Sequence, residues 1–114
     1  MPHRFPPLTP SEFDEIVVRS ELPVVIYVTR KCCKITSLAR REFLIAAEDF
    51  KATIGIFEVD AEDEKALVSR LNVNAVPILL VFHSGIERAA LLGFYSADAL
   101  RKRLRSSIPT GDGG

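Results

Sequence analysis

The sequence has no tryptophan, one methionine, two histidines and two cysteines, and its 15 basic residues balance 15 acidic ones. Without a basic excess, it lacks the charge that binding to nucleic acid or to an anionic membrane surface requires. No apolar run approaches the roughly 20 residues that span a bilayer. The first seven residues are rich in proline and lack the apolar core of a signal peptide. We therefore expect a cytoplasmic protein with no nucleic-acid and no membrane partner.

The scarce cysteines and histidines restrict the chemistry further. Cys32 and Cys33 are adjacent, so they do not form the disulfide framework of a small secreted domain. Such cysteine usage agrees with a reducing compartment. His3 and His83 are widely separated in the sequence, whereas a metal site needs convergent ligands. We therefore expect neither a metal nor another cofactor. A chain of 114 residues suffices for one hydrophobic core, so we expect a single domain that acts as a monomer.

The spacing of apolar residues indicates alternating helices and strands. Together with a capping box at Thr9–Glu12 and a cap at Ser96, it predicts helices over residues 10–19, 33–50, 62–70 and from 97 onward. Apolar runs predict strands over residues 23–28, 54–59, 77–82 and 87–92. This order predicts an α/β fold with a mixed sheet covered on both faces. We expect residues 1–7 to be irregular, 8–108 to form the domain and 109–114 to be a flexible tail.

Two segments of the sequence resemble a known family. The first strand runs into Thr29-Arg30-Lys31-Cys32-Cys33-Lys34-Ile35-Thr36, and Val76-Pro77 stands just before the apolar run of residues 78–82. Weaker matches are Leu8-Thr9 with Phe13, Val59-Asp60, Gly85 and Gly93. Together these residues resemble the thioredoxin family over about residues 8–108. The resemblance implies a three-layer α/β sandwich, in which helices flank a mixed central sheet on both faces.

The cysteine motif carries the chemistry that the resemblance implies. Cys33 falls on the nucleophilic cysteine of the family, Cys32 on the preceding tryptophan, and Thr36 on the second, resolving cysteine. A position at the start of a helix favours the thiolate form of Cys33, and so do the nearby cations, Arg30, Lys31 and Lys34. Thr36, one turn further on, would donate its hydroxyl to the sulfur. The alternative is that both cysteines are small apolar fillers of the core.

The proline completes the site that the resemblance implies. An X-Pro bond has only a small trans preference, so Pro77 can be held cis at the head of its strand, leaving the Val76 backbone free to pair with a substrate peptide. We expect Val76 and Pro77 to hold the substrate, with Gly93, Arg30 and Lys34 beside it. The partner is then a thiol- or disulfide-containing protein, or a small thiol such as glutathione.

Other positions depart from the family pattern. A buried aspartate and its lysine partner, which relay protons in thioredoxins, are matched here by Tyr27 and Ile56. Two residues of the apolar rim are matched by Thr29 and Arg30. Cys32 is a poor resolver, because a ring between neighbouring cysteines is strained. It is therefore either a spectator thiol or one half of a vicinal disulfide.

The sequence leaves functions of different classes open. In the first, Cys33 performs single-cysteine thiol–disulfide chemistry through a mixed disulfide that an external thiol releases. In the second, the protein is an adaptor without turnover, which binds a partner in the groove between Cys33, Val76 and Gly93. In the third, the same groove takes an oxidised small thiol instead of a protein. The retained cysteine favours the first function, and the missing resolving thiol and proton relay favour the second.

Overall fold

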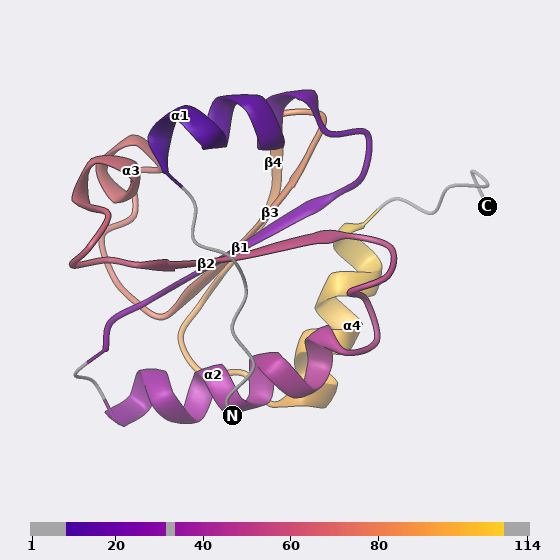
Figure 1. Cartoon of the computed structure of the whole chain (residues 1–114). Coiled ribbons are helices and arrows are strands. Elements are labelled where there is room, and N and C mark those ends of the chain that lie inside the picture. The colour runs from indigo at the N-terminus through magenta and orange to yellow at the C-terminus, as the bar shows by residue number, and fades with distance from the viewer. Residues whose placement is uncertain (1–8, 32–33, 109–114) are drawn as a thin grey trace.

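A four-stranded mixed sheet forms the middle layer of the protein, and helices cover both of its faces (Figure 1). The computed structural model describes residues 9–31 and 34–108. The strands lie in the order β2-β1-β3-β4 and are β1 (Val24–Thr29), β2 (Gly55–Asp60), β3 (Ile78–His83) and β4 (Ile86–Leu92). β1 is parallel to β2, while β3 is antiparallel to both β1 and β4. The predicted α/β sandwich with a mixed sheet is confirmed.

Helices lie on each face of this sheet (Figure 1). α1 (Pro10–Phe13) continues into a π-helical turn, Asp14–Val18, and together with α3 (Lys65–Arg70) it covers one face. α2 (Lys34–Ala47) and α4 (Ala97–Ser107) cover the other. In the part of the chain that the structure describes, no helix is both long enough and apolar enough to cross a membrane.

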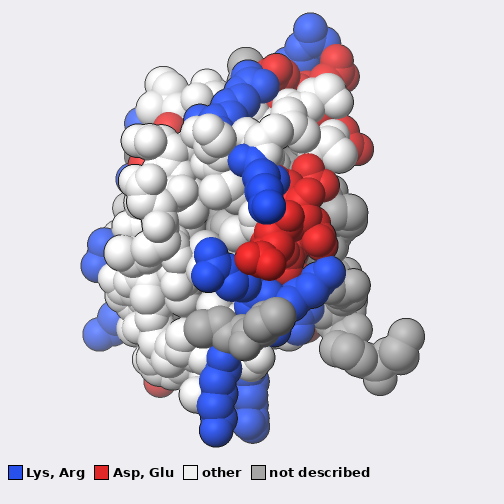
Figure 2. All heavy atoms as spheres, turned by 90° about the vertical axis from the view of Figure 1, so that its left-hand side faces the viewer, with Lys and Arg blue, Asp and Glu red and all other residues white. Residues whose placement is uncertain are grey.

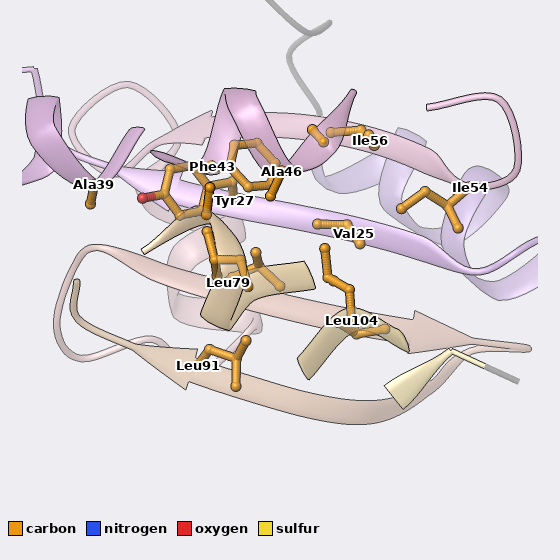
Figure 3. Packing of buried hydrophobic residues seen from close by; sticks show 14 residues of the cluster. Val25, Tyr27, Ala39, Phe43, Ala46, Ile54, Ile56, Leu79, Leu91 and Leu104 are labelled. Carbon is orange, nitrogen blue, oxygen red and sulfur yellow. The ribbon is translucent and has the colours of Figure 1, made fainter. Parts of the chain in front are cut away.

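β1 is one of the two inner strands of the sheet, and all six of its residues are buried. Val25 and Tyr27 face the core under α2 and α4, where Phe43 and Leu104 point toward the sheet (Figure 3). Val24, Ile26 and Val28 face the opposite core, which includes Leu67 of α3. Because both faces are covered, the strand is apolar without alternation, as its sequence indicates.

The first helix begins at the capping box that the sequence predicts. The N–H of Thr9 donates to Glu12 Oε1 over 3.1 Å, and the N–H of Glu12 donates to Thr9 Oγ1 over 3.3 Å. The helix predicted over residues 10–19 is confirmed in its extent, and within it residues 14–18 are π-helical. Apolar spacing over so short a segment does not distinguish the two helix types.

Two other helices differ in length from their predictions. α3 begins at Lys65 and not at residue 62. The carboxylate of Asp60 accepts hydrogen bonds from the N–H groups of Glu62, at 2.8 Å, and Asp63, at 3.2 Å, and so makes a turn after β2. α2 ends at Ala47 and not near residue 50, in a turn that leads to β2. The helix at 97 starts as predicted, with Ser96 Oγ accepting from the N–H of Ala99 at 3.2 Å.

β3 and β4 form the predicted antiparallel hairpin. Ser84 and Gly85 have φ angles of 54° and 79°, as two-residue hairpin turns require. A bulge between Val81 and Phe82 shifts the register near the turn. The predictions for the end segments 1–7 and 109–114 lie outside the described residues, and so do those for the two cysteines.

Candidate active site

The carboxyl ends of β1 and β2 lie at the same edge of the sheet. Because these strands are parallel, Thr29 pairs with Asp60 at their last positions. The N–H of Ala61 then donates to the carbonyl of Thr29 over 2.8 Å. The segments that follow the two strands therefore start side by side.

β1 continues from this edge into the cysteine motif. Two residues follow the strand before the cysteines, and α2 begins at Lys34. Cys32 and Cys33 lie outside the described residues, so the sequence alone places Cys33 directly before the helix. At such a position, the free amide groups and the dipole of a helix favour a thiolate.

The cations beside the cysteines are paired with carboxylates of the loop between β2 and α3. Arg30 Nε lies 3.7 Å from Glu62 Oε2, and Lys31 Nζ lies 2.9 Å from Asp63 Oδ2. Figure 2 shows the acidic side chains gathered next to basic ones on this side of the molecule. Lys34 is exposed and forms no ion pair with any residue that the structure describes. Two of the three cations predicted to favour the thiolate are therefore compensated in part.

Thr36 stands where the resemblance places a resolving cysteine, and it is only 2% exposed. Its Oγ1 donates a hydrogen bond of 2.6 Å to the carbonyl of Arg30. This bond ties the first turn of α2 to the residue that follows β1. The predicted donation to the sulfur of Cys33 involves an atom outside the described residues. The position three residues after Cys33 is therefore occupied by a buried hydroxyl.

Val76, Pro77 and Gly93 lie together at the same edge of the sheet. The Val76–Pro77 peptide bond is cis. The carbonyl of Pro77 accepts a hydrogen bond of 2.8 Å from the N–H of Gly93, whose φ of 96° favours glycine. Val28 pairs with Ile78, so Pro77 lies beside the end of β1, from which the cysteine motif continues. The structure thus brings these three predicted binding residues to the edge that carries the motif.

Tyr27 and Ile56, which match the acid and lysine of the family, both belong to the core under α2. Tyr27 is 3% exposed and stacks on Phe43, with ring centroids 4.2 Å apart and an angle of 17° between the rings (Figure 3). Burial raises the pKa of Tyr27, and the Glu58 carboxylate adds to the rise, while the Arg40 guanidinium opposes it. Tyr27 is therefore a neutral phenol at physiological pH and cannot act as a base.

A charged pair that sequence reasoning missed lies beside Tyr27. Glu58 of β2 is opposite Tyr27 in the strand register. Arg40 of α2 donates two hydrogen bonds to its carboxylate, one from Nε and one from Nη2 at 3.1 Å. Hydrogen bonding to Glu58 raises the pKa of Arg40, and burial opposes this rise. A glutamate two positions after Ile56 in a strand faces the same side, and this spacing is the signal that could have revealed it.

Large apolar side chains are exposed near the motif. Ile35 and Leu38, in the first half of α2, are each about half exposed, and so are Leu92 and Phe94 on either side of Gly93. The sequence comparison indicates a loss of apolar rim residues after β1. The exposed side chains on α2, at the end of β4 and directly after it provide apolar surface at other positions around the same edge.

The fold and the site define a class of protein. A mixed sheet with this strand order, a cysteine motif between β1 and α2, and a proline at the head of β3 are the features of a thioredoxin-like protein. The thioredoxin family model matches residues 4–106, which is most of the chain. The protein therefore belongs to the thioredoxin family.

Curated relatives agree with this assignment. A thioredoxin of Rickettsia bellii is 17% identical over 101 residues, which cover 89% of this chain and 96% of the relative. The protein disulfide-isomerase erp38 of Neurospora crassa is 33% identical over 84 residues, covering 71% of this chain but 23% of the relative. A chloroplastic M-type thioredoxin of Spinacia oleracea is 20% identical over 83 residues, covering 73% of this chain and 46% of the relative. The chain thus spans nearly all of the first relative and less than half of the other two. These relatives support a thiol–disulfide oxidoreductase-like function at the level of the family.

Proposed function

We propose that the protein exchanges thiols and disulfides with Cys33 as its single reacting cysteine. The thiolate of Cys33 attacks one sulfur of a substrate disulfide, which forms a mixed disulfide and releases the other sulfur as a thiolate. An external thiolate then attacks the substrate sulfur of the mixed disulfide, and Cys33 leaves as a thiolate. The external thiol belongs to glutathione or to a cysteine of a partner protein.

The observation that carries this proposal is the buried hydroxyl of Thr36. In a dithiol motif, the residue one turn after the nucleophile attacks the mixed disulfide and closes a ring. The hydroxyl of Thr36 donates to the carbonyl of Arg30 at 2.6 Å, and a hydroxyl is not a nucleophile for disulfide sulfur at neutral pH. Under the proposal the mixed disulfide is resolved from outside, and Cys32, whose ring with Cys33 would be strained, is a spectator.

Charge at the start of α2 supports an acidic Cys33. The helix begins at Lys34, the residue after Cys33, and its side chain is exposed. A helix N-terminus and an adjacent cation both stabilise a thiolate. Since Tyr27 is neutral and Glu58 is held by Arg40, the attacking thiolate has to be formed without a buried base.

Val76, Pro77 and Gly93 would hold the substrate. Pro77 is anchored through its carbonyl to the N–H of Gly93 and lies beside the end of β1. A substrate strand placed along Val76 would therefore lie next to the cysteine motif. Ile35 at the start of α2 and Phe94 next to Gly93 are exposed and could offer it apolar contacts.

Formation of a mixed disulfide tests the proposal directly. The protein is incubated with glutathione disulfide, and intact mass spectrometry with peptide mapping locates the adduct. We expect one glutathionyl group on Cys33 in the wild type and in Cys32→Ser, and none in Cys33→Ser. An adduct that forms equally well in Cys33→Ser would refute the assignment of the nucleophile.

An adaptor without turnover is the second candidate. The exposed Ile35, Leu38 and Phe94 favour it, since exposed apolar side chains of this size are typical of binding surfaces. Turnover of insulin disulfides separates the two functions. If the protein is a single-cysteine oxidoreductase, the wild type reduces insulin slowly. Thr36→Cys then adds a resolving thiol one turn from Cys33 and restores part of the insulin-reducing activity. An adaptor shows no activity in either form, and it binds its partner unchanged in Cys33→Ser.

A further inference from the structure

The ion pairs beside the cysteine motif join two segments that the sheet already holds together. A backbone hydrogen bond of 2.8 Å connects the end of β1 to the residue after β2. The turn made by the Asp60 carboxylate follows at once and carries Glu62 and Asp63. These two carboxylates lie 3.7 Å from Arg30 Nε and 2.9 Å from Lys31 Nζ. The β2–α3 loop is thus positioned to change the charge around the cysteines.

Stability does not account for this arrangement. The four side chains of the two ion pairs are 53% to 61% exposed. Exposed pairs of this kind contribute between nothing and about 1 kcal/mol to folding. Their main physical effect is therefore on the electrostatic potential at the motif that they flank.

The loop offsets most of the local positive charge. Three cations adjoin the cysteines in the sequence, namely Arg30, Lys31 and Lys34. Arg30 and Lys31 are paired with Glu62 and Asp63. Without these two carboxylates the motif would be strongly cationic and would attract anionic thiols. With them, three cations and two carboxylates leave one positive charge, so this attraction is much weaker.

We infer that Glu62 and Asp63 determine the charge of the disulfides that react with Cys33. The inference rests on the proposed function, in which the Cys33 thiolate attacks a disulfide and a second thiolate leaves. The two carboxylates weaken the attraction of the site for anionic disulfides and its repulsion of cationic ones. The substrate class therefore extends to disulfides flanked by neutral or basic groups, and glutathione disulfide, which is anionic, gains little from the charge of the site.

Coulomb's law sets the size of the effect. In water, two unit charges roughly 8 Å apart change a rate by about two- to threefold. Removing both carboxylates therefore changes the rate of one singly charged disulfide by about fourfold to ninefold, and the ratio of the rates of two oppositely charged disulfides by about 15-fold or more at low salt. Screening by salt reduces this ratio, because the side chains are exposed.

Three small disulfides of different charge test the inference on the full chain. They are cystamine, which is cationic, hydroxyethyl disulfide, which is neutral, and glutathione disulfide. The rate of adduct formation on Cys33 is measured for each by mass spectrometry. The ratio of the cystamine rate to the glutathione disulfide rate is compared between variants. Because both reagents meet the same thiolate, a change in the thiol pKa cancels in this ratio.

A matched control separates local from overall charge. Glu62→Gln with Asp63→Asn removes two negative charges beside the motif. Glu21→Gln with Glu87→Gln removes two charges at the opposite edge, before β1 and next to the hairpin turn. We expect the first double variant to lower the ratio about 15-fold or more at low salt, and the control to leave it within about twofold.

Each outcome bears on a different statement. If Cys33 reacts with none of the three reagents, the proposed function fails and the inference fails with it. If it reacts with all three and the ratio in Glu62→Gln with Asp63→Asn equals that of the wild type, only the charge selection is overturned. An equal change in the control variant overturns it too, because the effect would then belong to net charge. A lowered ratio that returns toward the wild-type value as salt rises supports it.

Discussion

Ion pairs of the same chemistry occur in two different surroundings in this protein. Arg40 and Glu58 join α2 to β2 with side chains that are 24% and 13% exposed. The two pairs between the cysteine motif and the β2–α3 loop have side chains that are more than half exposed. The first pair is bidentate and lies against Tyr27, whereas each of the others is a single contact at the surface.

Solvent decides what each kind of pair does. A pair removed from water is costly to break, because the remaining charge is left without its partner in a poorly solvated place. An exposed pair is readily replaced by water and ions. The Arg40–Glu58 pair, called the inner pair below, therefore affects the stability of the fold. The Arg30–Glu62 and Lys31–Asp63 pairs, called the outer pairs, affect the electrostatic potential that an approaching substrate meets.

The largest expected effect lies at the inner pair. Glu58→Leu leaves the Arg40 guanidinium half-buried without its carboxylate, and we expect the free energy of unfolding to fall by about 2 to 3 kcal/mol. Urea unfolding followed by circular dichroism measures this change. A loss below about 0.5 kcal/mol would show that the inner pair contributes no more to the free energy of unfolding than exposed pairs do.

A double variant shows whether the loss comes from the stranded charge. Arg40→Met combined with Glu58→Leu replaces both charges by apolar groups, and we expect it to lie within about 1 kcal/mol of the wild type. If the double variant is as unstable as Glu58→Leu alone, the loss comes from the packing of leucine in β2 and not from the charge on Arg40.

Alkaline pH tests the same region with a smaller effect. The pKa of Tyr27 is raised in the folded protein above its ordinary value near 10, which is the value in the unfolded chain. The folded state therefore holds this proton where the unfolded state loses it. The contribution of Tyr27 to stability is complete below pH 10 and falls by up to about 1.4 kcal/mol per pH unit above it. Tyr27→Phe removes this part of the pH dependence, and equal slopes in both proteins would contradict the expectation.

The smallest effect on stability is expected at the outer pairs. Glu62→Gln with Asp63→Asn should change the free energy of unfolding by less than about 0.5 kcal/mol. The same variant should lower the thiol pKa of Cys33, because two negative charges near the thiolate are removed. Alkylation as a function of pH, assigned to each cysteine by mass spectrometry, measures this shift. A loss of stability as large as that of Glu58→Leu would remove the contrast between the two regions.

Local signals in the sequence were sufficient for most of the elements. The cap at Ser96, the capping box at Thr9 and the turn at Gly85 each depend on residues three or fewer positions apart. The uninterrupted apolar run of β1 correctly indicated a strand buried on both faces. The start of α3 was wrong because the carboxylate of Asp60 binds backbone groups that a helix would otherwise use.

The sequence predicted the parts of the candidate site that depend on the position of each residue, but not the contacts between distant residues. Val76, Pro77 and Gly93 were named from their positions and do lie together. The partners of Arg30 and Arg40 are distant in the sequence and were not foreseen. Such contacts depend on the strand register and on side-chain reach, and neither can be read from spacing along one segment. The chemistry of Cys33 itself stays a prediction.

The hydroxyl of Thr36 has a kinetic consequence under the proposed mechanism. With a thiol at that position, a covalent complex would decay at a rate of its own, whatever the surroundings contain. With a hydroxyl there, the lifetime of the complex becomes inversely proportional to the concentration of free thiol outside it. The protein would release its partner quickly where thiols are abundant and retain it where they are depleted, so that the time spent in the complex measures the reducing capacity of the surroundings.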